Sequence, residues 1–135
     1  LYTYQGAVDA CPEGWRLPTD EDWQSLEMAM GMSVSDAGKK DAWRGNIAKR
    51  ILSIYGTVTD FNALLAGWYF PHTNMGLSGC RYYGVYAAFW TATKDQSEAN
   101  GYYYRKFFYS NDGIFRSSTA PDMGFSVRYV RDAKE

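Results

Sequence analysis

The stretch "YYYRKFFYSNDGIFRSSTA", residues 102–120, contains two strand-like runs on either side of a turn. Tyrosine, phenylalanine, isoleucine and threonine favour strands, and residues 110–113 are typical of a hairpin turn because Asn, Asp and Gly tolerate positive φ. Successive strand residues point to opposite faces of a sheet. Both faces therefore carry rings, with Tyr103, Phe107 and Tyr109 on one and Tyr102, Tyr104 and Phe108 on the other. One set can fill a core, and the second needs another cover.

That cover could be the rest of the chain or a foreign molecule. Half of the aromatic residues of the chain lie between Tyr82 and Phe115, and small polar residues follow the rings. Tyrosine mixed with Ser, Gly, Asn and Asp is typical of adaptable binding surfaces. A core strand that ends in a polar turn is the alternative. For the cluster as a whole we expect a role in recognition.

The N-terminal third is predicted to be helical after a short strand and a turn. Thr19 is a suitable N-cap, and acidic residues follow in the first turn of a helix that Gly31 ends. A second helix is predicted over residues 45–55, because Ile47, Ile51 and Leu52 share a face. Further strands are expected at residues 61–70, 87–93 and 124–132. The tryptophans are expected in the core, namely Trp15, Trp23, Trp43, Trp68 and Trp90.

Composition indicates one globular domain over residues 1–135. Hydrophobic residues make up 46 %, charged residues 21 %, and the net charge is -1. This balance excludes a basic nucleic-acid-binding stripe. No apolar run approaches the roughly 18 residues that a membrane span needs, so we expect neither nucleic acid as a partner nor insertion of this domain into a membrane.

Catalytic, metal and cofactor sites are not expected. The only histidine, His72, lies in a segment without a nucleophile pattern. A calcium site is disfavoured because calcium prefers six to eight oxygen ligands and the long loop at residues 71–86 offers only Asn74. Asp95, Glu98 and Asn100 form a sparse group that we expect to be solvated.

Several stretches together resemble one family. "ACPEGWRLPTDEDWQSL" (10–26), "FNALLAGWY" (61–69), "AAFWTAT" (87–93) and "GFSVRYVRD" (124–132) are similar, in order and spacing, to the Fibrobacter succinogenes major paralogous domain. The resemblance implies an α+β, C-type-lectin-like fold, with two helices packed on a small twisted mixed β-sheet with long loops. It also implies secreted or surface-exposed bacterial proteins, often lipoproteins or parts of adhesins, without established enzymatic activity.

A narrower resemblance concerns the C-terminal third. Residues 87–132 are similar to the variable region of proteins diversified by retroelements that mutate adenines. Scaffold positions would be Phe107, Ile114 and Arg116. Variable positions would be Asp95, Ser97, Lys106, Phe108, Ser110, Asn111, Asp112, Phe115, Ser117, Ser118 and Thr119. An ordinary family member without diversification is the alternative.

The cysteines depart from the family pattern. The family usually ends in "RCVRD", whereas this chain has Tyr129 at the cysteine position. The resemblance thus implies that Cys11 has lost its usual partner. Cys80 could replace it only if the two α-carbons approach within about 7 Å, and we expect two unpaired thiols.

The sequence thus favours a non-enzymatic, extracellular or cell-surface module that recognises a protein or glycan on another cell or surface. A structural module of a surface lipoprotein or fibre, with the same rings packed internally, is the alternative. The expected ligand-binding residues are Tyr82, Tyr83, Tyr86, Asp95, Ser97, Lys106, Phe108, Ser110, Asn111, Asp112, Phe115, Ser117, Ser118 and Thr119.

Overall fold

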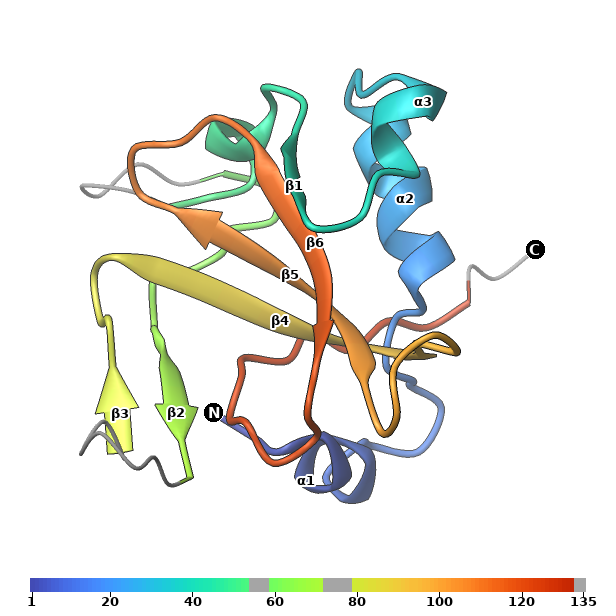
Figure 1. The fold of residues 1–135 in the computed structure, drawn as a ribbon, viewed down its shortest axis with the longest axis vertical. Helices are drawn as coiled ribbons and strands as arrows, with labels where there is room; N and C mark the ends of the chain where they lie inside the picture. Colours follow the sequence, from blue (N-terminus) through green and yellow to red (C-terminus); the bar gives the residue numbers. More distant parts are fainter. Residues whose placement is uncertain (54–58, 72–78, 133–135) are drawn as a thin grey trace.

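The computed structural model describes residues 1–53, 59–71 and 79–132, which form an α+β fold (Figure 1). The helical elements are α1 (Tyr4–Asp9), α2 (Asp20–Ala29), α3 (Val34–Ala37) and the 3-10 helix η1 (Ala48–Arg50). The strands are β1 (Ala42–Arg44), β2 (Trp68–Phe70), β3 (Gly79–Arg81), β4 (Tyr86–Lys94), β5 (Tyr102–Phe108) and β6 (Ile114–Thr119). His72, Asn74 and Tyr55 lie outside the described residues.

The predicted hairpin is confirmed. β5 and β6 pair antiparallel with Tyr102 opposite Thr119 and Lys106 opposite Phe115, and the side chain of Asn111 accepts a hydrogen bond from the Gly113 N–H within the turn. The hairpin is the centre of a four-stranded sheet of order β1-β6-β5-β4, and β2 and β3 form a separate pair. All of these strand pairs are antiparallel. The expectation of a mixed sheet was therefore wrong, since parallel pairing is confined to isolated bridges.

The predicted cap of α2 is also confirmed. The Thr19 hydroxyl accepts from the Asp22 N–H at 3.0 Å, and the Asp22 carboxylate accepts from the Thr19 N–H at 2.8 Å. This reciprocal capping box satisfies two backbone donors that a helix start otherwise leaves free. It fixes where α2 begins and hence where its inward residues, Trp23 and Glu27, meet the sheet.

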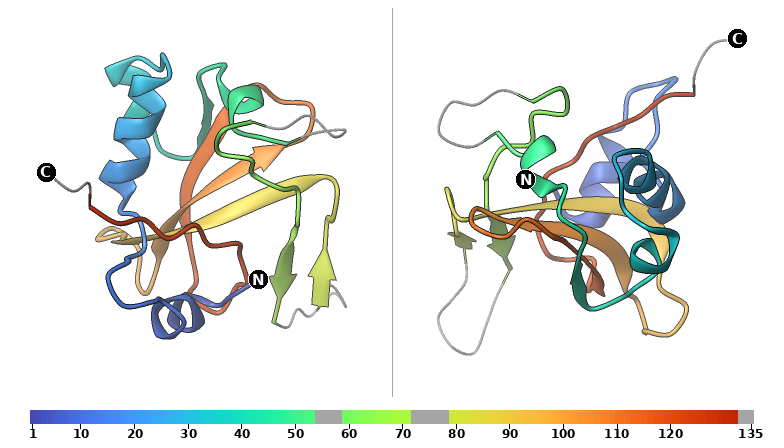
Figure 2. Two further views of the ribbon diagram at one scale, coloured as in Figure 1. Left: turned by 180° about the vertical axis from the view of Figure 1, so that it is seen from behind. Right: turned by 90° about the horizontal axis from the view of Figure 1, so that it is seen from above.

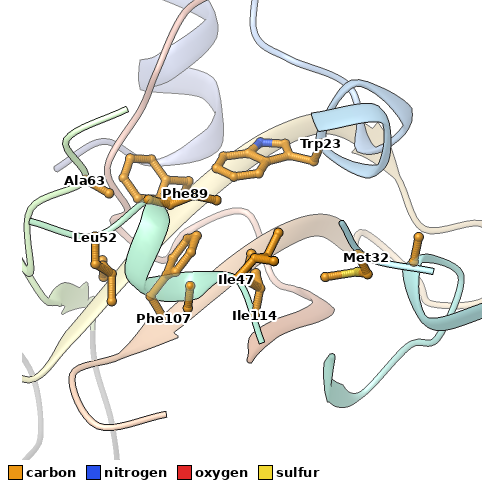
Figure 3. Packing of buried hydrophobic residues seen from close by; sticks show 12 residues of the cluster. Trp23, Met32, Ile47, Leu52, Ala63, Phe89, Phe107 and Ile114 are labelled. Atoms are coloured by element: carbon orange, nitrogen blue, oxygen red, sulfur yellow. The ribbon is translucent and has the colours of Figure 1, made fainter. Parts of the chain in front are cut away.

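One face of the sheet is covered by α2, α3 and η1. Alternate residues of β4 and β5, including Phe89 and Phe107, pack with Trp23 of α2 and with Ile47 and Leu52 around η1 (Figure 3). The buried cluster consists of Trp23, Met32, Ala37, Ile47, Ala48, Ile51, Leu52, Ala63, Ala87, Phe89, Phe107 and Ile114.

The opposite face is covered at one end only. Ala88 and Trp90 of β4 pack there with Ala7 of α1, with Leu17 and with Phe125 of the C-terminal segment. That segment runs beside β4 (Figure 2), where Phe89 and Ser126 form a bridge. The rings of Tyr102 and Tyr104 join this cluster. The other end of the same face, toward the β5–β6 turn, carries the residues discussed below.

Three elements differ from the prediction, and one of them is the strand expected at residues 61–70, which is present as the short β2. The helix expected over residues 45–55 is a single 3-10 turn, although Ile47, Ala48, Ile51 and Leu52 are buried as that pattern required. Local bonds, such as that from the Leu52 N–H to the Ala48 carbonyl, form this turn. Further bonds tie it to other segments, since the Ala48 N–H donates to the Asp112 carbonyl and the Ala63 N–H to the Ile51 carbonyl. The stretch 124–132 forms only isolated bridges, because Phe125, Ser126 and Val130 pair with three different segments.

A buried charge network joins α2 to the sheet. The Glu27 carboxylate accepts from Arg44 Nη2 at 2.6 Å and from Arg105 Nε at 3.0 Å. Asp20 accepts from Arg105 Nη1 at 2.6 Å and from Arg116 Nη2 at 2.8 Å. Burial lowers the pKa of Arg44 to about 10 against the attraction of Glu27. Every one of these side chains is buried or nearly so, and they fix the register of β1, β6 and β5 under α2.

The tryptophan prediction holds in part. Trp23 and Trp90 are in the core, whereas Trp15 is 42 % exposed and lies against Arg131. Trp43 and Trp68 are half-buried on the open face. The prediction for Trp15 was wrong because its turn leaves the ring partly exposed, with the Arg131 guanidinium over it.

Both thiols are unpaired, as predicted for Cys11 and Cys80. At the position of the missing family cysteine, the Tyr129 hydroxyl donates to the Ala7 carbonyl at 2.6 Å. This hydrogen bond links the C-terminal segment to α1, so the two segments are joined without a disulfide.

Candidate functional site

The uncovered end of the sheet presents a continuous set of half-buried side chains, which we call the aromatic face. It comprises Trp43, Trp68, Tyr86, Lys106, Phe108 and Phe115. The strand register explains their proximity, because Tyr86 is opposite Phe108, Lys106 is opposite Phe115, and Phe115 is opposite Trp43. Directly opposed residues of antiparallel strands point to the same side.

The β2–β3 hairpin forms one wall of the aromatic face beside the start of β4 (Figure 1). The Trp68 ring centroid lies 4.8 Å from that of Tyr86 and 5.0 Å from that of Tyr82. Gly67, with φ +68°, allows this approach, since a Cβ there would lie 2.0 Å from the Arg81 carbonyl oxygen. A glycine is therefore required where the hairpin closes.

The rings become more exposed toward the edge of the aromatic face. Tyr86 contacts Phe108 at a centroid distance of 4.9 Å, and Phe108 contacts Tyr109 at 4.9 Å. Tyr109 is 42 % exposed, Tyr82 is 41 % exposed and Tyr83 is 88 % exposed. Covering rings of this size is a main source of affinity in protein interfaces. Phe108, of the second predicted set of rings, is thus half-buried, whereas Tyr109, which alternation placed on the face of Phe107, is exposed because β5 ends at Phe108.

Lys106 lies among the rings and has no oxygen partner among the described residues. Its Nζ atom is 4.3 Å from the Phe115 centroid, 5.6 Å from Trp43, 5.7 Å from Tyr86 and 5.9 Å from Trp68. These are cation–π distances. Burial lowers the pKa of the Lys106 ammonium. Lysine tolerates this position because its apolar stem packs on the rings while the rings partly stabilise the charge.

A small cavity lies where this face meets the cluster around Phe125. Its volume is about 180 Å³, and it is lined by Trp68, Phe70, Tyr104, Lys106, Thr119, Met123 and Phe125. The Trp68 Nε1 atom is buried and has no acceptor among the described residues. Two of the residues that line this cavity, Lys106 and Trp68, thus carry donors without an oxygen partner among the described residues.

A second group of predicted site residues surrounds Asp95 and is separate from the aromatic face. The Asp95 carboxylate accepts from Ser97 Oγ at 2.7 Å and from Ser118 Oγ at 2.6 Å, and it pairs with Lys40 at 2.6 Å. Lys40 above all holds the pKa of Asp95 well below its usual range. Asp95 is 2 % exposed, so the expectation of a solvated residue was wrong. The sequence could not show that Lys40 would meet this carboxylate.

The group around Asp95 borders a polar cavity of about 320 Å³. The residues that line this cavity include Lys40, Asp41, Glu98, Ser117, Ser118 and Thr119. Ser117 is buried and donates to the Asp41 carboxylate. The hydroxyls of Ser117 and Ser118 are therefore engaged within the protein. Thr119 lines both this cavity and the one beside Lys106.

The predicted turn residues belong to neither cavity. Asp112 is exposed, pairs with Lys49 at 3.2 Å and receives the Ala48 N–H on its carbonyl. Asn111 closes the turn, and Ser110 is exposed. Of the predicted site residues, Tyr82, Tyr86, Lys106, Phe108 and Phe115 are brought together, with Tyr83 next to them in the chain.

Sequence reasoning missed Trp43 and Trp68 as parts of this surface. Both were assigned to the core because apolar rings usually lie there. The signal that could have found Trp68 is Gly67, which indicates close backbone approach in a strand. No comparable signal marks Trp43, since its position depends on the pairing of β1 with β6.

Among the described residues, no group of three His, Cys, Asp or Glu side chains could hold a metal ion. None of the described helices is long and apolar enough to cross a membrane.

The model of the Fibrobacter succinogenes major domain family matches residues 1–131. The chain therefore belongs to this family. Comparison with curated proteins gives no match, and comparison with solved structures gives none either.

Proposed function

We propose that this chain is a non-enzymatic recognition module with a C-type-lectin-like fold, carried on the outside of a bacterial cell, which binds a protein or glycan through the aromatic face. The observation that carries the proposal is the graded set of rings that runs from half-buried Trp68 and Tyr86 to Tyr82, Tyr109 and the 88 % exposed Tyr83. A module with purely structural rings would cover them with its own chain.

The proposed diversification also has some support in the arrangement of β5 and β6. The residues expected as scaffold, Phe107, Ile114 and Arg116, are buried. Of the positions expected to vary, Lys106 and Phe115 point to the open face, whereas Asp95 and Ser117 are buried. Substitutions at the outward positions would change the surface without changing the core. Sequencing the gene from independent isolates tests this, because diversification requires differences concentrated at the outward positions.

The recognition proposal is tested on an array of immobilised bacterial surface proteins and glycans probed with the labelled domain. We expect a bound ligand whose signal falls at least tenfold in the double variant Tyr83→Ala/Tyr109→Ala, since each ring is an exposed anchor. Trp15→Ala is the matched control, because Trp15 is as exposed as Tyr109 but lies outside the aromatic face.

Two results would count against the proposal. One is an array with no ligand, which favours the alternative of a structural module in a surface fibre. The other is a ligand whose binding is reduced by Trp15→Ala and not by the tyrosine variant, which places recognition elsewhere on the domain.

A further inference from the structure

Lys106 differs from the other cations that are at least half-buried in the described part of the chain. Arg44, Arg105 and Arg116 each bind a buried carboxylate. Lys40 pairs with Asp95, and the partly buried guanidinium of Arg128 donates to the Phe61 carbonyl. A cation that has lost part of its hydration is normally compensated by an oxygen acceptor.

Lys106 has aromatic rings in place of that acceptor. Arg116 shows that ring contacts do not normally replace a carboxylate in this protein, because it lies 4.6 Å from the Tyr103 centroid and still binds Asp20. A cation–π contact at a partly exposed site is worth roughly 0.5–1 kcal/mol in general, and it leaves the three ammonium donors without oxygen. The face therefore presents an unneutralised positive charge in an apolar surrounding.

The cavity beside Lys106 indicates the size and polarity of the missing group. Its lining is mainly the rings of Trp68, Phe70 and Phe125 with Met123. Polar atoms come from Lys106, Thr119 and Tyr104 at most, and Trp68 adds a buried donor without an acceptor. The cavity suits a short apolar stem that ends in an anionic oxygen group.

This chemistry favours an acidic side chain over a sugar acid. A sugar ring brings several hydroxyls that each require a hydrogen bond when buried, and the lining offers few groups to meet them. A glutamate or aspartate side chain requires one cation and apolar walls. The exposed tyrosines at the edge could then pack on the neighbouring residues of the same polypeptide.

We propose that the cavity beside Lys106 accepts the carboxylate of an acidic side chain of a polypeptide ligand, with the ammonium as its counterion and the Trp68 and Phe70 rings as apolar walls. The inference rests on the proposed recognition function and specifies its ligand class. It also explains why β5 places a lysine between Tyr104 and Phe108, where an apolar residue would pack with less cost in desolvation.

The test uses the whole domain and three probes. The first is an N-acetylated, C-amidated tripeptide with glutamate between two alanines, the second is the same peptide with glutamine, and the third is galacturonate. The readout is the indole N–H resonance of Trp68 in a proton–nitrogen correlation spectrum, assigned with Trp68→Phe. We expect the glutamate peptide to shift this resonance and to bind on the order of tenfold more tightly than the glutamine peptide, as a charge-assisted hydrogen bond implies.

Two variants of Lys106 complete the test. In Lys106→Met and Lys106→Gln we expect the difference in affinity between the two peptides to disappear while the domain stays folded. Both side chains occupy the space of the aliphatic part of lysine but carry no charge. Equal affinity for the glutamate and glutamine peptides would overturn the inference, and so would tighter binding of galacturonate, or the absence of any Trp68 shift at millimolar peptide.

The array separates this inference from the proposed function. A ligand that depends on Tyr83 and Tyr109 but binds Lys106→Met as well as the unmodified protein would leave the recognition function standing and overturn the role of Lys106. A protein ligand whose binding is lost in Lys106→Met, and whose own acidic residues are required, would support both.

Discussion

Replacing Glu27 with alanine should be the most destabilising single change among the charged residues of the described chain. The Glu27 carboxylate accepts from both terminal nitrogens of Arg44, at 2.6 and 3.1 Å, and from Nε of Arg105 at 3.0 Å. Its removal leaves Arg44, fully buried and already with an unpaired Nε, with only the Ala37 carbonyl and the Met32 sulfur. Breaking a buried ion pair costs about 3–5 kcal/mol.

The structure places the expected loss near the middle of that range. Arg105 keeps its hydrogen bond to Asp20, so only one guanidinium is left without any carboxylate, and we expect a loss of about 4 kcal/mol from the free energy of unfolding. The total free energy of unfolding of a globular domain is about 5–15 kcal/mol, so this loss is a large fraction of it.

Urea unfolding followed by tryptophan fluorescence measures the loss. For a slope of about 2 kcal/mol per molar urea, the midpoint should fall by about 2 M. Glu13→Ala is the control, because Glu13 is exposed and should change stability by less than about 0.5 kcal/mol. A loss below about 1 kcal/mol for Glu27→Ala would refute the reasoning, since it would mean that the network does not hold α2 on the sheet.

Three further predictions follow from local features. The partners of Asp95 depress its pKa, so the stabilisation of the folded state by this carboxylate is present above its unfolded pKa of about 4 and is lost as the pH falls below that value. The urea midpoints of Asp95→Asn and of the unmodified protein should therefore differ at pH 7 and converge toward pH 3. A difference that stays constant with pH would contradict this. Gly67→Ala should lower the free energy of unfolding by at least about 2 kcal/mol, because the new Cβ would meet backbone atoms. Gly14→Ala is the control and should cost about 1 kcal/mol, because Gly14 also has positive φ but open space around it. Thermal melts compare the two variants, and equal losses would argue against the close approach at Gly67. A thiol reagent should titrate two free groups per denatured, unreduced chain, with exposed Cys80 reacting before Cys11 in the native protein; a titre of zero would show a disulfide.

Several elements were predictable because their signals are local. The cap at Thr19, the turn at residues 110–113 and the alternation of β5 each depend on neighbours within a few positions, and the structure reproduces them. The helix expected over residues 45–55 failed for the opposite reason. Its apolar face is buried as the pattern required, but the Ala48 N–H and the Ile51 carbonyl bond to Asp112 and Ala63, which no local pattern reveals.

The candidate site shows the same division. Strand alternation placed Phe108 on one face together with Tyr102 and Tyr104, and composition favoured recognition for the cluster as a whole. The sequence by itself thus determined that both faces of β5 carry rings. Only the tertiary structure decided which cations would be neutralised: the order β1-β6-β5-β4 and the position of α2 bring Glu27 and Asp20 to Arg105, whereas the next residue of the strand, Lys106, faces rings. Charge pairing depends on distances between segments far apart in the chain, and those distances are set by packing.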